Sequence, residues 1–329
     1  MENKTILNQL KLAYCPICNY DFAVLKKDPI IQSIIESSSL YIIAQRPEIR
    51  FDNINFNYDK LEMEFEIRQF DNPISLQCKL PLFQNNIATN KNKEVLIYLG
   101  SNSEITDSKT LPKSNIHCIK LYEDKYIDDN FLIWFSPDKF LYNFWTRQIN
   151  AVIEGDINKF TEYRVHYVGQ STKQSVWKRL TGHEKLQDIL SLEYPFTFGS
   201  LPTHEVIILL FTFEDNIQIK SFGEDSSGQE MMDFFMGKTM PHKETIYLDA
   251  EKALINAMNP KYNDKLFQNY PKSSDGLYNY NYKSILYTFV DPITLVYKEG
   301  CVKGSRLFPG GDTIVITDNE NIELVKQNQ

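Results

Sequence analysis

The chain of 329 residues is acidic, because 43 Asp and Glu outnumber 35 Lys and Arg, and 42% of its residues are apolar. This apolar fraction and an aromatic content of 13% exclude a disordered chain, and the net charge of −8 excludes a surface that is basic overall. No apolar stretch approaches the roughly 18 residues of a membrane-spanning helix, and the N-terminus carries no signal-peptide pattern. We therefore expect a soluble cytoplasmic protein that does not bind a membrane and whose five scattered cysteines are reduced.

Residues 1–145 are expected to form a β-rich region for recognition or regulation. The segment from Leu61 to Ile67 alternates strictly between apolar and charged side chains, as a half-buried strand does. Pro29 and the spacing of the isoleucines that follow it predict a short helix over 29–37. Further strands are expected at 95–99, 117–122 and 131–135, separated by turn-forming residues at 84–93 and 101–115.

Residues 146–268 change to an alternation of strands and helices. Strands are expected at 163–168 and 205–213, and helices at about 175–190 and from near Asp249 to Pro260. Residues 269–329 return to strands, at 284–290, 293–298 and 313–317. The predicted fold class is therefore α/β, with β-rich regions on both sides of the middle one.

The predicted helix at 175–190 carries two polar residues on its apolar face. At about 100° per residue, Arg179 and His183 fall within the stripe that Val176 and Leu180 define, and they lie side by side. A guanidinium on a buried face needs an anion or a cleft. The two residues are therefore candidates for a functional site, although a structural arginine and a core histidine would produce the same pattern.

Basic residues concentrate around this helix. Between positions 164 and 185 the chain carries five basic residues and a single acid, Glu184. A positive patch beside an aromatic strand is typical of a phosphodiester site, whereas the alternative interpretation is an ordinary solvated helix face. The candidates for contacts with DNA are Arg164, Lys173, Lys178 and Lys185.

The second predicted helix supplies a carboxylate. Asp249 has the position of an N-cap, and the residues after it repeat with the spacing of a buried helix face. Glu251 lies at the edge of that face, where its carboxylate would reach a cleft. The alternative is that Glu251 only complements the helix dipole.

Four motifs in the middle of the chain resemble, in order, those of the GIY-YIG nuclease superfamily. They are Tyr167-Val-Gly169, Arg179-Leu-x-x-His183, Glu251-x-x-Leu-Ile255 and Pro260-Lys-Tyr-Asn263. The resemblance covers about residues 146–268. It implies a small mixed sheet flanked by helices and a metal-dependent hydrolysis of DNA phosphodiesters.

The resemblance also implies a role for each matching residue. Tyr167 would act as a general base or position the attacking water. His183 would orient or relay a proton near Tyr167. Arg179 would neutralise charge on the phosphate, and Asn263 would brace the site. Glu251 would hold one Mg²⁺ or Mn²⁺. The side chains of Tyr167, Arg179, His183 and Glu251 should then surround one cleft.

Two features depart from the pattern of this family. Ala151-Val-Ile153 stands where the GIY element is expected, and it contains neither tyrosine nor glycine. Tyr163 is a candidate substitute, because strict alternation places it on the same strand face as Tyr167. The long separation of His183 from Glu251 predicts an insertion at about 214–246, which would contact DNA or a partner.

Two hypotheses of function follow. The chain is expected to be a metal-dependent DNA endonuclease, in restriction, phage defence or a mobile element. The alternative is a catalytically inactive nucleic-acid-binding or assembly protein.

Cys15-Pro-Ile-Cys18 is half of a zinc site without a second half, so core cysteines are preferred to zinc. A homo-oligomer, and a ligand or protein partner of the N-terminal region, stay open.

Overall fold

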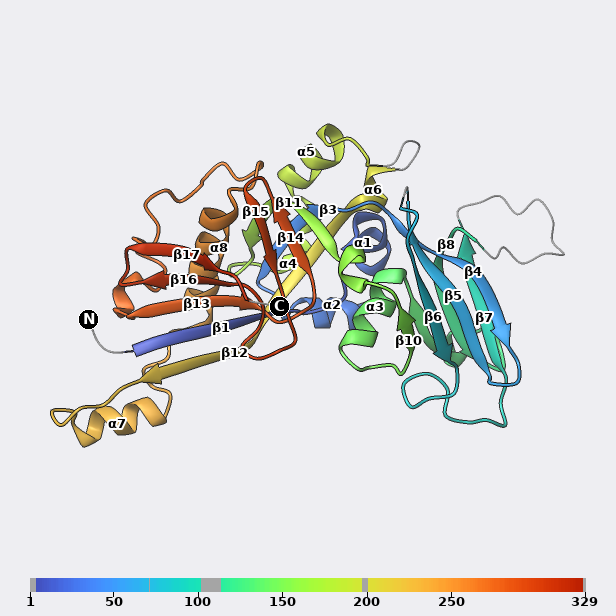
Figure 1. Cartoon of the computed structure of the whole chain (residues 1–329), viewed down its shortest axis with the longest axis horizontal. Coiled ribbons are helices and arrows are strands. Elements are labelled where there is room, and N and C mark those ends of the chain that lie inside the picture. The colour runs from blue at the N-terminus through green and yellow to red at the C-terminus, as the bar shows by residue number, and fades with distance from the viewer. Residues whose placement is uncertain (1–3, 71, 102–113, 197–200, 328–329) are drawn as a thin grey trace.

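The computed structural model describes residues 4–70, 72–101, 114–196 and 201–327 of the chain. These residues form two β-sheets, of ten and seven strands, and eight α-helices (Figure 1). The α/β class expected from the sequence is confirmed. None of the described helices is long and apolar enough to cross a membrane.

The ten-stranded sheet is assembled from strands that lie far apart in the sequence. Its order is β15-β14-β11-β3-β12-β1-β13-β16-β17, with β2 beside β12. The sheet is mixed, as expected, but it is not small, and it takes strands from each of the three predicted regions, 1–145, 146–268 and 269–329. The regions therefore do not correspond to the sheets. The strands are β1 (Lys4–Leu12), β2 (Ile17–Cys18), β3 (Leu40–Gln45), β11 (Glu162–Gln170), β12 (Val206–Lys220), β13 (Ser284–Phe289), β14 (Thr294–Tyr297), β15 (Gly300–Lys303), β16 (Thr313–Thr317) and β17 (Asn321–Val325).

The seven-stranded sheet is formed by the chain between β3 and β11. It contains β4 (Ile49–Asn57), β5 (Glu62–Gln69), β6 (Ser75–Pro81), β7 (Val95–Ser101), β8 (Ile116–Glu123), β9 (Phe131–Phe135) and β10 (Val152–Glu154). The alternation predicted from Leu61 to Ile67 is confirmed within β5, where Met63, Phe65 and Ile67 are buried, but Leu61 precedes the strand and is exposed. All strands of this sheet that are paired in register are antiparallel to their neighbours.

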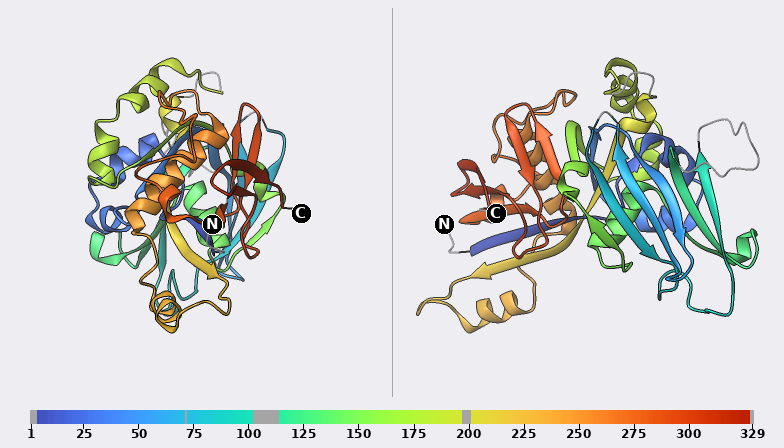
Figure 2. Two further views of the ribbon diagram at one scale, coloured as in Figure 1. Left: turned by 90° about the vertical axis from the view of Figure 1, so that its left-hand side faces the viewer. Right: turned by 45° about the vertical axis from the view of Figure 1, so that its right-hand side comes forward.

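The helices lie around and between the two sheets (Figures 1 and 2). They are α1 (Asn19–Leu25), α2 (Pro29–Ile35), α3 (Pro137–Trp145), α4 (Val176–Thr181), α5 (Glu184–Leu192), α6 (Pro202–Glu205), α7 (Gly228–Phe235) and α8 (Lys243–Met258), with short 3₁₀ turns at Asp128–Asn130, Ile157–Phe160 and Tyr278–Tyr280. Helix α3 joins the sheets, because Phe140 is buried in the core of the seven-stranded sheet and Trp145 also packs against the core of the ten-stranded one.

Strand β3 shows how the ten-stranded sheet is buried on both faces. Its six residues are all buried. Leu40 and Ile42 belong to the apolar cluster that includes α8. Tyr41 and Ile43 belong to the cluster on the opposite face, which includes residues of α1, α2, α4 and α5. A strand buried on both faces reads as a continuous apolar run, as this one does.

Both helices predicted in the middle region have different boundaries. The helix at 175–190 is two helices, α4 and α5, which are separated at Gly182 because the His183 ring accepts the Leu186 amide hydrogen and caps a new helix. The second helix begins at Lys243, so Asp249 is not an N-cap but a buried residue inside α8. The predicted insertion at 214–246 contains the end of β12, α7 and the start of α8.

Candidate active site

The candidate site lies along an edge of β11 that is covered by a loop. Strand β14 pairs with β11 only from Glu162 to Arg164. Beyond that point the loop after α8 takes the place of a strand, since the Tyr262 amide donates to His166 O at 3.1 Å. Asn263 follows with two bonds to Val168: its Oδ1 accepts from the amide at 3.0 Å and its Nδ2 donates to the carbonyl at 2.8 Å. Asn263 therefore holds the loop against β11.

One pocket, with a volume of about 330 Å³, opens at this edge. The five residues that the resemblance assigns to catalysis all line it: Tyr167, Arg179, His183, Glu251 and Asn263. They come from β11, α4, the N-cap of α5, α8 and the loop after α8, so tertiary packing and not one helix face brings them together.

Tyr41 is a member of this site that the sequence analysis misses. Strand β3 is antiparallel to β11, and the Tyr41 ring stacks on Tyr167 with 6.1 Å between the ring centroids. Arg179 Nε donates to Tyr41 Oη at 3.2 Å, and His183 Nε2 lies 2.9 Å from the same oxygen. Because His183 Nδ1 accepts from Leu186 N, the proton of the neutral ring is on Nε2 and is donated to Tyr41.

The prediction that Tyr163 shares a strand face with Tyr167 and replaces the missing GIY tyrosine is wrong. Tyr163 is fully buried, and its hydroxyl donates to Asp138 Oδ1 at 3.4 Å. A β-bulge between Val165 and Tyr167 breaks the alternation of β11, so Tyr163 and Tyr167 contact different apolar clusters. The segment 151–153 also lies elsewhere, since β10 pairs with β6 of the other sheet. The sequence signal that could have pointed to Tyr41 is the apolar run around it. This run predicts a buried strand, but it does not predict that the strand pairs with β11.

Burial controls the protonation of the site. It raises the pKa of Glu251 to about 7, although Lys252 and Arg179 act in the opposite direction. Burial also lowers the pKa of His183 to about 4, and the charge of Arg179 adds to this effect. The pKa of Tyr41 is raised, mainly by burial. At neutral pH the site therefore combines a charged guanidinium with a neutral histidine and a protonated Tyr41.

The carboxylates of this pocket limit which metal ion it could hold. The described part of the chain has no group of three or more His, Cys, Asp or Glu side chains that could hold a metal. Of the three carboxylates that line this pocket, only Glu251 is partly buried, beside Arg179, whereas Glu184 and Asp264 are exposed. A single carboxylate fits Mg²⁺ or Mn²⁺, because Mg²⁺ keeps several waters and takes its other ligands from substrate phosphates.

The residues expected to contact DNA do not form one patch. Lys185 lines the candidate pocket, because the break at Gly182 turns α5 relative to α4. Its Nζ lies 3.1 Å from Asp264, so its charge is compensated. Lys173 and Lys178 are exposed. Arg164 lines a different pocket.

Cys15 and Cys18 pack into the core around α1. Cys15 is buried against residues of α1 and α2, and Cys18 Sγ accepts from Asp21 N at 3.3 Å at the start of α1. Burial raises the pKa of both thiols, which favours the protonated form over the thiolate that binds zinc.

The pocket thus joins the Tyr167 hydroxyl, the Arg179 guanidinium, a neutral imidazole and the Glu251 carboxylate. The buried Tyr41 hydroxyl is bonded to Arg179 and His183, and the exposed Glu184 and Asp264 also line the pocket. This set is able to bind a phosphate, hold a cation and move a proton.

Comparison of the chain with protein-family models, with curated proteins and with solved structures gives no match.

Proposed function

We propose that this protein is a Mg²⁺-dependent endonuclease that hydrolyses DNA phosphodiester bonds in the pocket at β11. The observation that carries this proposal is the convergence of Tyr41, Tyr167, Arg179, His183 and Glu251, which come from five separate segments of the chain. A structural arginine would need only one buried acceptor. Here the guanidinium lines an open pocket and shares it with a carboxylate.

Arg179 and Glu251 would bind the reacting phosphate and its cation. Arg179 is fixed by its bond from Nε to Tyr41 and by a hydrogen bond with Tyr167, and its other N–H groups would bind phosphate oxygens. A Mg²⁺ ion held by Glu251 would polarise the phosphate and stabilise the leaving oxygen. The cation would also keep Glu251 ionised, against the burial that raises its pKa to about 7.

Tyr167 would position the attacking water. Tyr41 Oη accepts hydrogen bonds from Arg179 and His183, so its own proton is available to the neighbouring Tyr167 hydroxyl. A hydrogen bond from Tyr41 would orient the Tyr167 hydroxyl toward the water. His183 would therefore act through Tyr41, as a neutral donor that fixes the position of its hydroxyl.

Cleavage of supercoiled plasmid, with and without Mg²⁺, tests the proposal. Glu251→Gln keeps the size of the side chain but removes its charge, so we expect cleavage to fall by a factor of about 10² or more while DNA binding persists. Glu320→Gln, which changes an exposed glutamate outside the site, is the matched control and should cleave like the wild type. Cleavage at the wild-type rate by Glu251→Gln would contradict the proposal. DNA binding by a wild-type protein that never cleaves would favour the inactive binding protein instead.

A further inference from the structure

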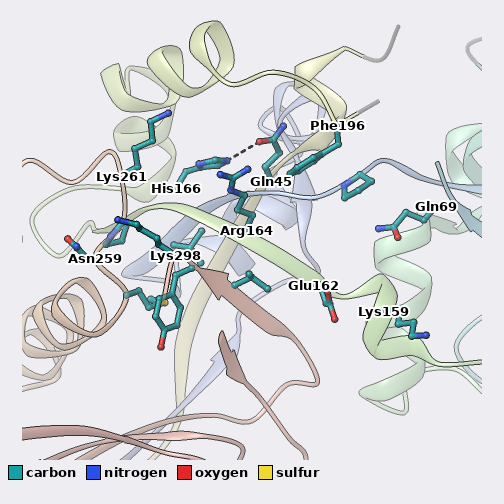
Figure 3. A pocket seen from close by; sticks show the side chains of 16 residues that line it. Gln45, Gln69, Lys159, Glu162, Arg164, His166, Phe196, Asn259, Lys261 and Lys298 are labelled. Carbon is teal, nitrogen blue, oxygen red and sulfur yellow. Dashed lines mark hydrogen bonds between the residues drawn. The ribbon is translucent and has the colours of Figure 1, made fainter. Parts of the chain in front are cut away.

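A second, larger pocket lies along β11 beside the candidate active site. It has a volume of about 720 Å³ and opens between the end of β14 and the start of the loop after α8. Figure 3 shows Lys159 and Glu162 at one end of this pocket, Lys261 and Asn259 at the other, and Arg164 between them. Four cationic side chains line it, namely Lys159, Arg164, Lys261 and Lys298, and Glu162 is its one acidic residue.

The positive charge of this pocket is largely unpaired. Lys261 Nζ lies 2.5 Å from Glu193, but Lys159, Arg164 and Lys298 have no ion pair or side-chain hydrogen bond with any residue that the structure describes. The chain as a whole has a net charge of −8. Unpaired cations that gather in a concave site of an acidic protein attract an anion to that site.

An aromatic side chain distinguishes the pocket from a site for a bare phosphate ion. Phe196 lines it and is 42% exposed, a large fraction for a phenylalanine. Tyr297, which also lines the pocket, is partly buried. Cations combined with an accessible aromatic ring are typical of surfaces that bind nucleic acids, where the ring contacts a base or sugar.

The two pockets follow one another along the same strand. Residues 259–261 line the second pocket and Asn263 lines the first, and between them the Tyr262 amide bonds to His166 O. Arg164 and Tyr167 are three residues apart in β11, so their Cα atoms are separated by at most about 10 Å. A strand of DNA advances by about 3.4 Å per nucleotide along its helix axis, so this distance corresponds to only a few phosphates.

We propose that this second pocket binds the phosphodiester backbone of the nucleic acid next to the scissile phosphate. The identity of the ligand rests on the proposed function, because the scissile phosphate is assigned to the neighbouring pocket. Arg164 and Lys298 provide the phosphate contacts, and Phe196 contacts a base or sugar. The site is a positioning site, since none of these side chains lines the pocket that holds Glu251.

Binding measurements in a Glu251→Gln background test this inference without cleavage. The Kd for a 30-base-pair duplex is measured over a range of salt concentrations for Arg164→Gln/Lys298→Gln and for the control Lys91→Gln/Lys125→Gln, which removes two exposed cations of the other sheet region. We expect the first pair to raise Kd by about tenfold or more and to reduce the slope of log K against log salt by roughly 2. The control should change Kd less than about twofold.

A charge-retaining variant and a neutral phosphate make the test specific. Arg164→Lys/Lys298→Arg should bind within about threefold of the parent, because most of the phosphate term is charge. Replacing one phosphate within three nucleotides of the cut by a methylphosphonate should weaken DNA binding by the Glu251→Gln parent. The same replacement should not change DNA binding by Arg164→Gln/Lys298→Gln. Loss of binding in the charge-retaining variant, or equal sensitivity of both proteins to the neutral phosphate, would overturn the inference.

The outcomes separate this inference from the proposed function. If the wild type cleaves DNA but Arg164→Gln/Lys298→Gln matches the control in Kd and salt slope, the inference fails and the function stands. If the wild type binds DNA through these cations but never cleaves it, the function fails and the inference stands. If the wild type cleaves DNA, the substitutions Arg164→Gln/Lys298→Gln should raise KM for DNA and leave kcat unchanged.

Discussion

Tyr41 and Tyr167 stack on each other in neighbouring strands, with 6.1 Å between their ring centroids, although the whole seven-stranded sheet separates them in the chain. The segment that forms the seven-stranded sheet can lie between these two strands because of where it begins and ends. Gln45, the last residue of β3, pairs with Arg164 of β11. The chain therefore leaves and re-enters the ten-stranded sheet at the same place, and a separate unit inserted there need not disturb the strand pair.

The hydroxyl of Tyr41 should be needed for turnover. Tyr41→Phe keeps the stacked ring but removes the acceptor for Arg179 and His183, so we expect kcat for DNA cleavage to fall by about 10- to 100-fold. Tyr163→Phe is the control, because it removes a buried hydroxyl from the same sheet outside the pocket and should alter stability more than kcat. Single-turnover cleavage of pre-bound DNA measures the effect. Equal rates for the wild type and Tyr41→Phe would show that the second hydroxyl is not used.

Arg179→Lys tests whether the guanidinium acts on the phosphate. The change keeps the charge but loses the planar donor group, and lysine does not replace arginine where two donors act together. We expect a loss of about 2–4 kcal/mol of transition-state stabilisation, the scale of one electrostatic donor. The melting temperature should change little, because the side chain is only half-buried. If activity is lost only together with the folded state, Arg179 is a structural residue.

Most of the site residues can be named from short motifs in the sequence, and Tyr167, Arg179, His183 and Glu251 all line one pocket. The reason expected for Arg179 and His183, one shared helix face, is wrong, because the two residues belong to α4 and to the N-cap of α5. The contact of Tyr41 is not local. An apolar run such as β3 indicates a buried strand, but nothing within it specifies which distant strand is its neighbour.

Helices and strands are predictable from the sequence where only one face of the element is buried. They are less predictable where two neighbouring elements bury their side chains in the same cluster. The alternation in β5 identifies that strand correctly. In contrast, the apolar spacing continues from Leu180 to Leu186 across Gly182, because α4 and α5 bury their side chains in the same cluster. The helical pattern therefore persists through a break in the helix. The bulge before Tyr167 likewise changes the facing of side chains without any sign in the sequence.

Asp249 should contribute strongly to stability, although Glu251 two positions later should not. Asp249 is buried and accepts hydrogen bonds from the Tyr270 and Tyr287 hydroxyls at 2.8 and 2.7 Å and from Leu277 N at 2.7 Å. Asp249→Ala leaves these three buried donors unpaired, which we expect to lower the free energy of unfolding by about 3–5 kcal/mol.

Glu251→Ala is the comparison on the same helix. It removes a partly buried carboxylate whose pKa is already raised to about 7 by burial, so the stability of the variant should equal or exceed that of the wild type. Urea unfolding of both variants measures the difference. Similar losses for the two would show that Glu251 is a structural residue of α8.

His166 should make the protein sensitive to mild acid. The ring is buried and bonds to Gln45 Oε1 at 3.0 Å, and burial lowers its pKa to about 4, although Glu193 acts in the opposite direction. The unfolded chain binds this proton near pH 6.5 and the folded chain only near pH 4, so the unfolded state holds more protons between these values. The free energy of unfolding should therefore fall as the pH drops from 6.5 to 4, by up to about 3 kcal/mol for this residue, and level off below.

The difference between the wild type and His166→Gln isolates this contribution. Other groups act at the same pH with the opposite sign, since burial raises the pKa of Asp21 to about 6 and the folded state then takes up its proton first. Urea unfolding at pH 7.5, 6, 5 and 4.5 should give parallel curves for the wild type and His242→Gln, which changes an exposed histidine. His166→Gln should lose less stability than either on acidification, by close to 1.4 kcal/mol per pH unit at most. A curve for His166→Gln that stays parallel to the wild type would mean that the histidine is already protonated in the folded state.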